Sequence, residues 1–393
     1  MFKQTLRALA LALCVLPLAA GCASRRAAVS ADEPAAVRNF TMTAATAAAE
    51  TAAPASPSET PETLEAAEPT PAQTPEALQP AALDYLAVKP YEAGQIMILM
   101  YHGLTEGEET DSYTRSVTHF REDLQALYDR AFRLMSMQDW RDNHVTVAAG
   151  FTPVILTFDD GKGSSFSLTD TGGSLQPAEN CAVDIMTKFS EAHPDFGNTA
   201  IFFVNGNAEP FKGAGTLQDR FAYLLDRGFE IGNHTYSHDS MKKLSAEGIQ
   251  EEIGRVDQMI RENSSGYIPY AISYPFGIKP QEALESFVLN GLWQDRAYHY
   301  DFALCVGQSG APSVPIRTGY DSLSVPRVRA SDNEATDLGW TLRYYEEHPE
   351  ARYISDGIPD RISVPEEYVD NVDESLLNGK ELYVYDKAGN KAR

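Results

Sequence analysis

Positively charged residues are scarce in this 393-residue chain. Lysine and arginine together number 32, against 56 aspartates and glutamates, and the formal net charge is −24. A nucleic-acid-binding surface needs a basic stripe or patch, so the composition argues against a nucleic-acid partner. The chain also lacks a dinucleotide fingerprint, a phosphate-binding glycine-rich loop and any evident internal repeat.

Long apolar runs are lacking as well. The run Ala8–Ala20 is too short to span a bilayer. Lys3 and Arg7 precede it and small residues follow it, which is typical of a secretory signal peptide. Because Cys22 comes directly after those small residues, residues 1–22 resemble a bacterial lipoprotein signal with Cys22 as the lipidated residue. We therefore expect an extracytoplasmic protein that a lipid anchors to a bacterial membrane; plain secretion is the alternative.

Cysteine is rare, with four in the chain. Cys14 lies within the expected signal peptide, which leaves Cys181 and Cys305 in the body of the protein besides Cys22. A disulfide between the two is allowed outside the cytosol, but sequence does not report their separation. Two buried free thiols are the favoured interpretation.

Residues 23–84 are rich in alanine, threonine, proline, serine and glutamate. No lysine or arginine occurs between Asn39 and Asp84. Such a composition cannot bury enough apolar surface to offset the entropy of ordering. We expect a disordered tether between the membrane and a folded body.

Short apolar runs alternate with amphipathic segments from residue 85 to residue 330. Alternating strands and helices joined by short loops predict a parallel sheet, and about seven such units favour one α/β domain built as a barrel. Residues 331–393 depart from this rhythm and are expected to form a C-terminal accessory extension. Expected strands are 95–101, 154–158, 199–204, 229–232, 270–274, 302–306 and 323–328, with short strands at 361–364 and 381–385. Expected helices include 177–192, 217–227, 280–290 and 337–348, and 170–176 is interpreted as a loop.

The run Val154–Phe158 ends in two adjacent carboxylates, Asp159 and Asp160, followed by Gly161. A short apolar run bounded by turn residues is typical of a strand buried on both faces. Carboxylates inside such a strand would be buried without partners, whereas at its carboxyl end they can line a pocket. On its own the motif is more often a solvated turn.

Two further polar clusters follow expected strands. His234 and His238 are four residues apart, and Pro275-Phe276-Gly277 follows the strand at 270–274. In a parallel α/β barrel these points and the aspartate pair share the rim that carries active sites. One carboxylate and two imidazoles would supply three metal ligands and leave a position for water or substrate.

The motifs Thr157–Gly161 and His234–His238 resemble those of the polysaccharide deacetylase family with a NodB-homology domain, a carbohydrate esterase family. The resemblance implies a distorted (β/α) barrel with a divalent metal, usually zinc. It also implies that Asp160, His234 and His238 bind this metal, and that Asp159 is the general base.

The same resemblance implies further roles. The backbone N–H of Phe276 would stabilise the oxyanion, with Pro275 and Gly277 beside it in the substrate site. Trp293 would line the acetyl pocket, although core packing is the commoner role for such a residue.

The chain departs from the family pattern at two points. Ser273 stands where many members have an arginine that orients the base, and Arg327 or Arg329 is the expected substitute. No histidine follows the strand at 323–328, where many members carry the general acid; His299 and His102 are the expected substitutes.

The leading hypothesis is therefore a metal-dependent hydrolase that removes acetyl groups from an N-acetylated cell-envelope or extracellular polysaccharide. An O-acetyl esterase acting on a xylan-like glycan, and a carbohydrate-binding barrel without turnover, are the alternatives. A third and weaker one is an iron oxygenase with two histidines and one carboxylate. No protein partner is predicted.

Overall fold

The computed structural model describes residues 83–307, 313–332 and 334–393. The expected signal peptide, with Cys22, and all of the expected tether before residue 83 lie outside these residues. Within the described part of the chain, no helix is long and apolar enough to cross a membrane.

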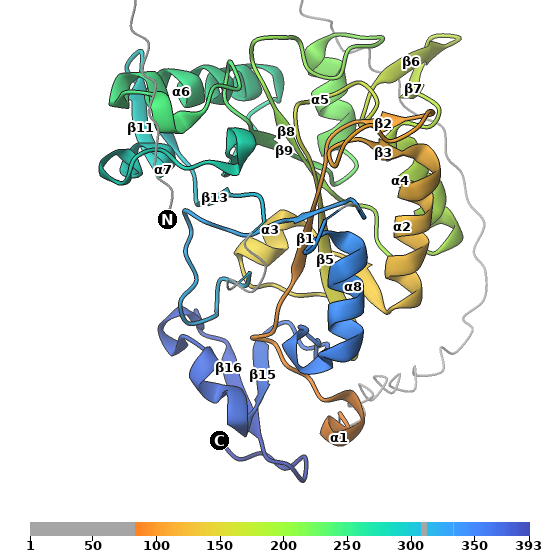
Figure 1. The fold of residues 1–393 in the computed structure, drawn as a ribbon, viewed down its shortest axis with the longest axis vertical. Helices are drawn as coiled ribbons and strands as arrows, with labels where there is room; N and C mark the ends of the chain where they lie inside the picture. The colour runs from red at the N-terminus through yellow and green to blue at the C-terminus, as the bar shows by residue number, and fades with distance from the viewer. Residues whose placement is uncertain (1–82, 308–312, 333) are drawn as a thin grey trace, which may run out of the picture. The chain divides into compact units, whose positions relative to one another are not determined.

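A parallel sheet of eight strands runs through the centre of the described body (Figure 1). The strand order is β13-β10-β9-β8-β5-β1-β14, with β4 paired to β5. Every pairing within this sheet is parallel, so the carboxyl ends of all its strands share one rim. The strands are β1 (Met97–Tyr101), β4 (Phe132–Leu134), β5 (Thr152–Phe158), β8 (Ile201–Val204), β9 (Glu230–Asn233), β10 (Ala271–Ser273), β13 (Phe302–Leu304) and β14 (Val328–Arg329).

The sheet curls until its two edges are joined by one short segment. Val325 forms a bridge with Leu304 of β13, and Val328 pairs with Leu99 of β1. The expected strand at 323–328 is therefore reduced to two isolated bridges, at Val325 and Arg327, and the two residues of β14. The prediction of a distorted α/β barrel is confirmed.

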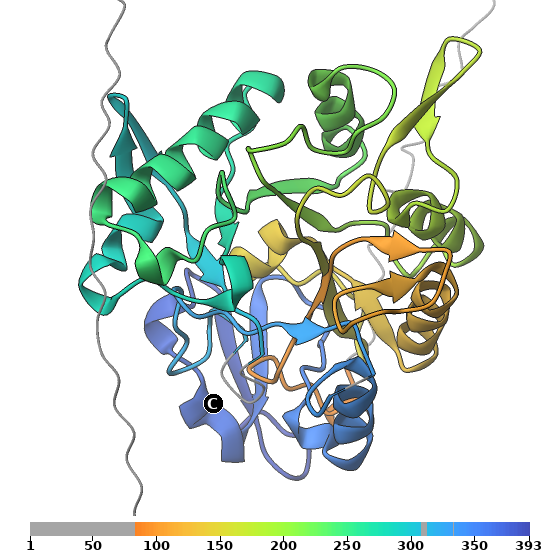
Figure 2. The same ribbon diagram turned by 45° about the horizontal axis from the view of Figure 1, so that its top comes forward.

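Helices surround the curled sheet, as the tilted view shows (Figure 2). Alternate residues of β5 face opposite ways: Val154, Leu156 and Phe158 pack in one core cluster, and Ile155 packs in another. Both faces of the strand are thus buried, as its unbroken apolar run predicts. The α-helices are α1 (Tyr85–Val88), α2 (Val117–Asp129), α3 (Met137–Arg141), α4 (Ala182–Ala192), α5 (Leu217–Leu225), α6 (Ala246–Asn263), α7 (Ser286–Leu289) and α8 (Leu338–Glu347). The 3₁₀ helices are η1 (Met241–Lys243), η2 (Pro275–Gly277), η3 (Glu282–Leu284), η4 (Pro349–Ala351), η5 (Glu366–Asn371) and η6 (Glu374–Leu376).

The segment expected to be a loop at 170–176 is part of a hairpin, β6 (Leu168–Thr171) and β7 (Ser174–Pro177). Gly172 and Gly173 both adopt positive φ, and the Asp170 carboxylate accepts the Gly173 N–H, which makes a tight turn. Pro177 ends β7 rather than opening a helix, so the helix expected at 177–192 starts five residues later. The expected helix at 280–290 is likewise broken into η3 and α7.

A second hairpin that the sequence did not predict follows α7. It consists of β11 (Asn290–Trp293) and β12 (Arg296–His299), which pair antiparallel. The hairpin lies against α6, where the Trp293 side chain approaches Gly254. This close approach explains a glycine in the middle of a long helix.

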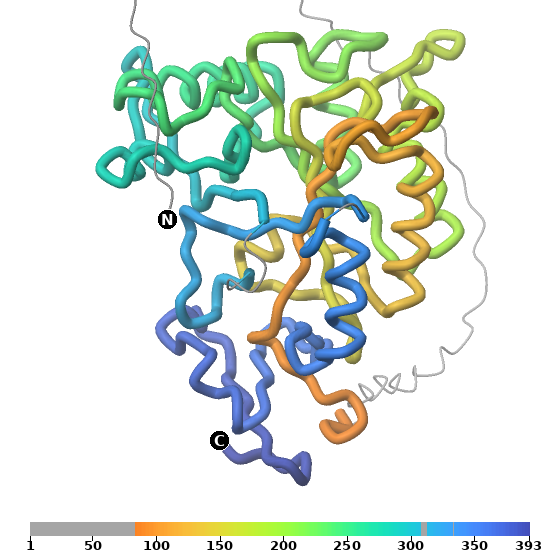
Figure 3. The backbone as a smooth tube through the Cα atoms, viewed as in Figure 1, coloured from red at the N-terminus to blue at the C-terminus, as the bar shows by residue number. Residues whose placement is uncertain are grey.

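The C-terminal extension shares the core of the barrel. Its strands β15 (Arg361–Pro365) and β16 (Glu381–Tyr385) pair in parallel, close to their predicted positions. Ile362 and Val384 of these strands belong to the same buried cluster as Ile98 of β1. The backbone trace shows the start of the described chain running beside this extension (Figure 3). Cys181 and Cys305 are buried free thiols, as expected.

Glu92 joins the entry segment to the extension. Its carboxylate accepts the backbone N–H groups of Asp356 and Ser363 at 3.1 and 2.7 Å, and its side chain is buried. Burial, with the nearby Asp356 carboxylate, raises the pKa of Glu92 to about 8. The folded protein therefore holds a proton here that the unfolded chain has already lost above its ordinary pKa of 4.5.

We expect stability to fall as pH rises from about 5 to 8, because over this window only the folded state keeps the Glu92 proton. Urea unfolding across this range measures the slope. Glu92→Gln should flatten it, whereas Glu347→Gln, at an exposed position of α8, should not. Equal slopes in all three proteins would contradict the role assigned to Glu92.

Candidate metal centre and active site

The aspartate pair lies where β5 reaches the rim. Ile155 and Thr157 face the barrel interior, and Asp159 continues this alternation, so its side chain is buried. Asp160 has a left-handed backbone with φ of 72°, and its side chain is 23% exposed. Such strained backbone in a non-glycine residue clusters at functional sites. The two neighbours therefore reach one site from different directions.

The histidine pair follows β9. His234 is buried and His238 is partly exposed. The chain between them is held by Asn205, whose side-chain amide donates to the carbonyls of His234 and Thr235 at 2.6 and 3.2 Å. Asn233 accepts the Thr235 N–H at 2.8 Å. These bonds fix a tight excursion in which Thr235 and His238 have φ of 65° and 59°.

Asp160, His234 and His238 converge. Their candidate ligand atoms all lie within 4.8 Å of one another. His234 Nε2 is 3.5 Å from Asp160 Oδ1, and His238 Nε2 is 3.7 Å from the same oxygen. The structure thus brings together the three residues that the sequence proposed as metal ligands.

The orientation of His234 fits a metal ligand. Its Nδ1 lies 2.9 Å from the carbonyl oxygen of Ser273, so Nδ1 carries the proton and donates it there. Nε2 is then a lone-pair acceptor, buried and without a hydrogen-bond partner. An unsatisfied buried acceptor is costly, whereas a cation at this point would use it. Two imidazoles and a carboxylate are ligands that suit zinc and other divalent transition metals.

Asp159 has a different partner. Both guanidinium NH groups of Arg327 donate to its two carboxylate oxygens at 2.8 Å, in a bidentate ion pair with almost no solvent exposure. Arg327 therefore occupies the place expected for a base-orienting arginine. Arg329, the other candidate, instead contacts Glu334 and Asp337.

Arg327 is itself anchored on the segment that closes the barrel. It also donates to the Cys305 carbonyl and the Thr157 hydroxyl at 3.0 and 3.1 Å. Burial alone would raise the pKa of Asp159, but the charge and hydrogen bonds of the Arg327 guanidinium act against it, and the pKa is lowered to about 2. Asp159 is consequently a carboxylate, held ready to accept a proton, at every pH near neutrality.

Comparison with known proteins gives one family match. Residues 147–292 match the family model described as polysaccharide deacetylase. These residues are therefore similar to a polysaccharide deacetylase domain. No curated protein matches the chain by sequence.

Solved structures of similar fold include three bacterial proteins of low identity. A deacetylase, PplD, from Streptococcus pyogenes is 17% identical over 63% of this chain and 96% of its own, with a TM-score of 0.47. BC0361, a polysaccharide deacetylase from Bacillus cereus, is 19% identical over 64% of this chain and 69% of its own, with a TM-score of 0.45. IcaB from Ammonifex degensii is 16% identical over 65% of this chain and 98% of its own, with a TM-score of 0.44.

Ser273 connects the two halves of the site. Its hydroxyl lies 2.6 Å from His234 Nδ1 and donates to Asp159 Oδ1 at 3.3 Å. β10 and β5 are not neighbours in the sheet, so only the curvature of the barrel allows this contact. A lone serine carries no sequence signal for this contact, which is seen only in the folded protein.

The expectation that His299 serves as the acid is not supported by its position. His299 ends β12, before the amino end of β13, and is bonded to Asn290 and Asp301. The site lies at the opposite, carboxyl ends of the strands. Trp293 of the neighbouring β11 packs against α6 and is likewise not placed at the rim.

His102 lies at the rim instead. It follows β1, whose last residue Tyr101 pairs with Phe158, so His102 is in register with Asp159. Burial lowers the pKa of His102, and the charges of Asp159 and Asp160 act on it in the opposite direction. Its Nδ1 is buried and has no hydrogen-bond partner. Of the two substitutes named from sequence, His102 is the one near the site.

The turn Pro275-Phe276-Gly277 forms η2 directly after β10. Pro275 is buried, and the Phe276 ring lies edge-on to His238 with 4.7 Å between ring centroids. Gly277 has φ of 66°, and a side chain there would collide with the backbone of Val306. The turn thus lies against the metal-ligand cluster, where the sequence placed it.

Arg327→Met should lower the free energy of unfolding by about 3–5 kcal/mol, because it leaves the buried Asp159 charge without a partner. The double variant Asp159→Asn with Arg327→Met removes both charges and should recover a large part of this loss. Urea denaturation of the four proteins measures the cycle. Additive losses would contradict the ion pair as the main interaction of Arg327.

Proposed function

We propose that this protein is a metal-dependent deacetylase that removes acetyl groups from an N-acetylated polysaccharide of the cell envelope or extracellular matrix. The observation that carries the proposal is the convergence of Asp160, His234 and His238 beside a second carboxylate, Asp159, that has its own arginine. One carboxylate is left to bind a metal while the other is reserved as a base. Zinc is the metal that this donor set fits best.

Each residue has a role in hydrolysis. A divalent metal, when bound, lowers the pKa of a water ligand and polarises the acetyl carbonyl. Asp159 accepts the proton of the attacking water, a contribution of about 10²–10⁴-fold to the rate. The backbone N–H of Phe276 donates to the developing oxyanion. Arg327 and Ser273 keep the Asp159 carboxylate oriented toward the site.

His102 is the proposed proton donor to the leaving amine. Its position beside Asp159 supports this role. Because burial lowers its pKa, the ring is neutral at rest, and it must gain a proton during turnover before it can give one. An alkoxide needs this proton less than an amine does. O-acetyl ester hydrolysis is therefore the second candidate function, favoured by a neutral His102.

The cellular setting follows from the N-terminal sequence. A lipid on Cys22 and a tether up to residue 84 would hold the domain outside the cytoplasm, within reach of an acetylated polysaccharide at the cell surface. Metabolic labelling with a palmitate analogue, compared between the parent and Cys22→Ala, tests the anchor.

Asp159→Asn should retain the metal, because Asp159 is not among the three converging ligands, and should lose acetate release by about 10²–10⁴-fold. Zinc content measured by mass spectrometry and acetate released from N-acetylglucosamine oligomers check both parts. Unchanged activity would refute Asp159 as the base. Loss of zinc would show that Asp159 belongs to the ligand set.

His102→Asn should slow acetamide hydrolysis more than acetate-ester hydrolysis, because an amine is the poorer leaving group. The measurement is kcat for N-acetylglucosamine oligomers and for an acetylated xylan oligomer. His299→Asn is the matched control and should change neither rate. Equal slowing of both substrates by His102→Asn would point to a role in holding the site rather than in proton donation.

A further inference from the structure

Two exposed aromatic rings lie beside imidazoles of the site. Tyr113 is 47% exposed and Phe276 is 63% exposed, both among the few large apolar side chains at the surface of the described residues. The Tyr113 ring lies edge-on to His102 with 5.2 Å between centroids, and Phe276 lies edge-on to His238 at 4.7 Å. Exposed apolar surface next to polar groups of a rim is typical of a ligand-binding site.

Folding does not explain the exposure of Phe276. Its backbone has φ of 59°, a left-handed conformation that is a genuine outlier for a bulky residue. Such strain persists where the surroundings impose it. A glycine or asparagine would suit this backbone better, which points to a functional role for the exposed Phe276 ring rather than a role in folding.

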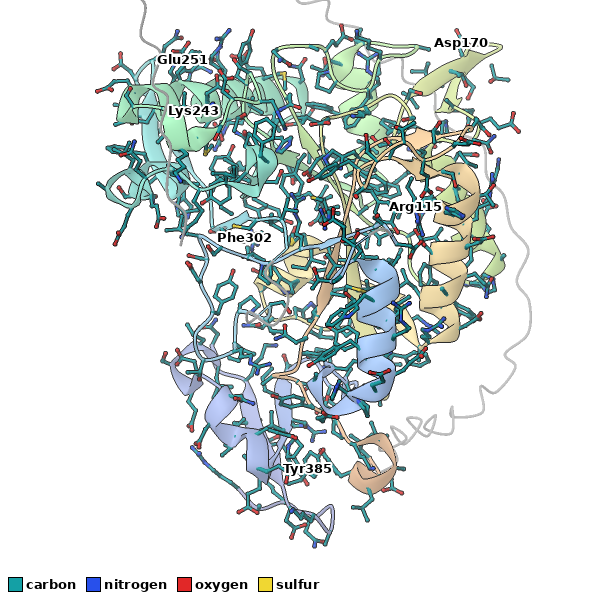
Figure 4. The ribbon with its side chains drawn as sticks, in the orientation of Figure 1. Arg115, Asp170, Lys243, Glu251, Phe302 and Tyr385 are labelled. Atoms are coloured by element: carbon teal, nitrogen blue, oxygen red, sulfur yellow. The ribbon has the colours of Figure 1, made fainter. Side chains whose placement is uncertain are left out.

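Tyr113 is carried by a braced excursion between β1 and α2. The two ends of this excursion pair as β2 (Leu104–Thr105) and β3 (Arg115–Ser116). Arg115, labelled in Figure 4, is buried between Asp123 and Asp332 and fixes the second end. The ring position is therefore set before any ligand arrives.

The backbone of Tyr113 is held within the protein, where its N–H donates to the Asp111 carboxylate at 2.9 Å. Its ring lies edge-on to His102 and is 47% exposed, which leaves apolar ring surface open to solvent. A fixed ring with an open face is suited to stacking on a flat apolar ligand surface.

The two rings bracket the ligand cluster. In the strand order β10-β9-β8-β5-β1, Phe276 follows β10 and Tyr113 contacts the residue that follows β1. The proposed metal ligands follow β5 and β9, which lie between them. A chain of sugars crossing the site from one ring to the other would therefore place an internal sugar at the ligands.

We propose that the Tyr113 ring is a sugar-stacking platform on the β1 side of the site, paired with Phe276 on the β10 side. The C–H face of a pyranose buries apolar area against each ring. The substrate is then an internal hexosamine of a polymer with a sugar on each side, rather than a monosaccharide or a chain end. This inference rests on the proposed function for the identity of the reacting sugar.

Binding separates the platform from the chemistry. Full-length zinc-loaded Asp159→Asn protein is titrated by calorimetry with N-acetylglucosamine oligomers of increasing length. Affinity should rise with length until both rings are covered. In this background Tyr113→Ala should weaken binding of the long oligomers about tenfold and leave the monosaccharide unaffected. Tyr113→Phe keeps the ring and should bind within about threefold of the parent.

Ile268→Ala is the control for loss of an exposed apolar side chain elsewhere, since Ile268 is 59% exposed and precedes β10 at the opposite end of the barrel. It should bind every oligomer as the parent does. Equal binding of all lengths, or equal loss in Tyr113→Phe and Tyr113→Ala, would overturn the platform. If the parent releases no acetate but length-dependent binding persists, the proposed function fails and the platform stands.

Discussion

The buried ion pair between Arg327 and Asp159 is the interaction on which the arrangement of the site depends. Asp159 is almost fully removed from solvent, and a carboxylate in such a place is tolerated only with a matched cation. The cation comes from residues 325–328, which bridge to β13 and pair with β1. The segment that closes the barrel therefore also neutralises the Asp159 carboxylate. The site therefore depends on the closed barrel, which supplies the partner of Asp159.

The site is held in a conformation that the chain would not choose locally. Left-handed backbone at Asp160, Thr235, His238 and Phe276 gathers around one buried lone pair, that of His234 Nε2. Asn205, which follows β8, donates to the His234 carbonyl, and His234 Nδ1 donates to the Ser273 carbonyl of β10, so both bonds hold His234 in place. A cation at this point would satisfy the unpaired acceptor, and the strained backbone persists because the surrounding structure imposes it.

Elements with a local sequence pattern could be predicted from the sequence. The apolar run of β5, the two motifs and the shared rim of a parallel barrel were enough to bring Asp160, His234 and His238 together. The boundary errors came from short-range turn chemistry, as at the glycine pair that turns β6 into β7. A glycine pair is itself a hairpin signal, but the flanking residues of β6 and β7 are mostly exposed and lack the apolar alternation that predicts strands.

Long-range partners were harder to assign. Arg327 and Arg329 are two residues apart on one segment, and only the register of the closing strand decides which one faces Asp159. The same holds for His102 and His299, which both follow or precede strands but at opposite ends of them. The end of the barrel a residue occupies depends on pairings between distant segments, which one sequence does not reveal.

The closing segment has a practical consequence for anyone who trims the protein. The family match ends at residue 292, yet the arginine that neutralises Asp159 is at 327, and the strand that leads to His102 starts at 97. A fragment limited to the matched residues would have a sheet with two open edges and would leave the Asp159 charge without its partner. The smallest fragment that can fold with this site must include both Asp159 and its partner Arg327, and its boundaries therefore lie outside the residues that match the family model.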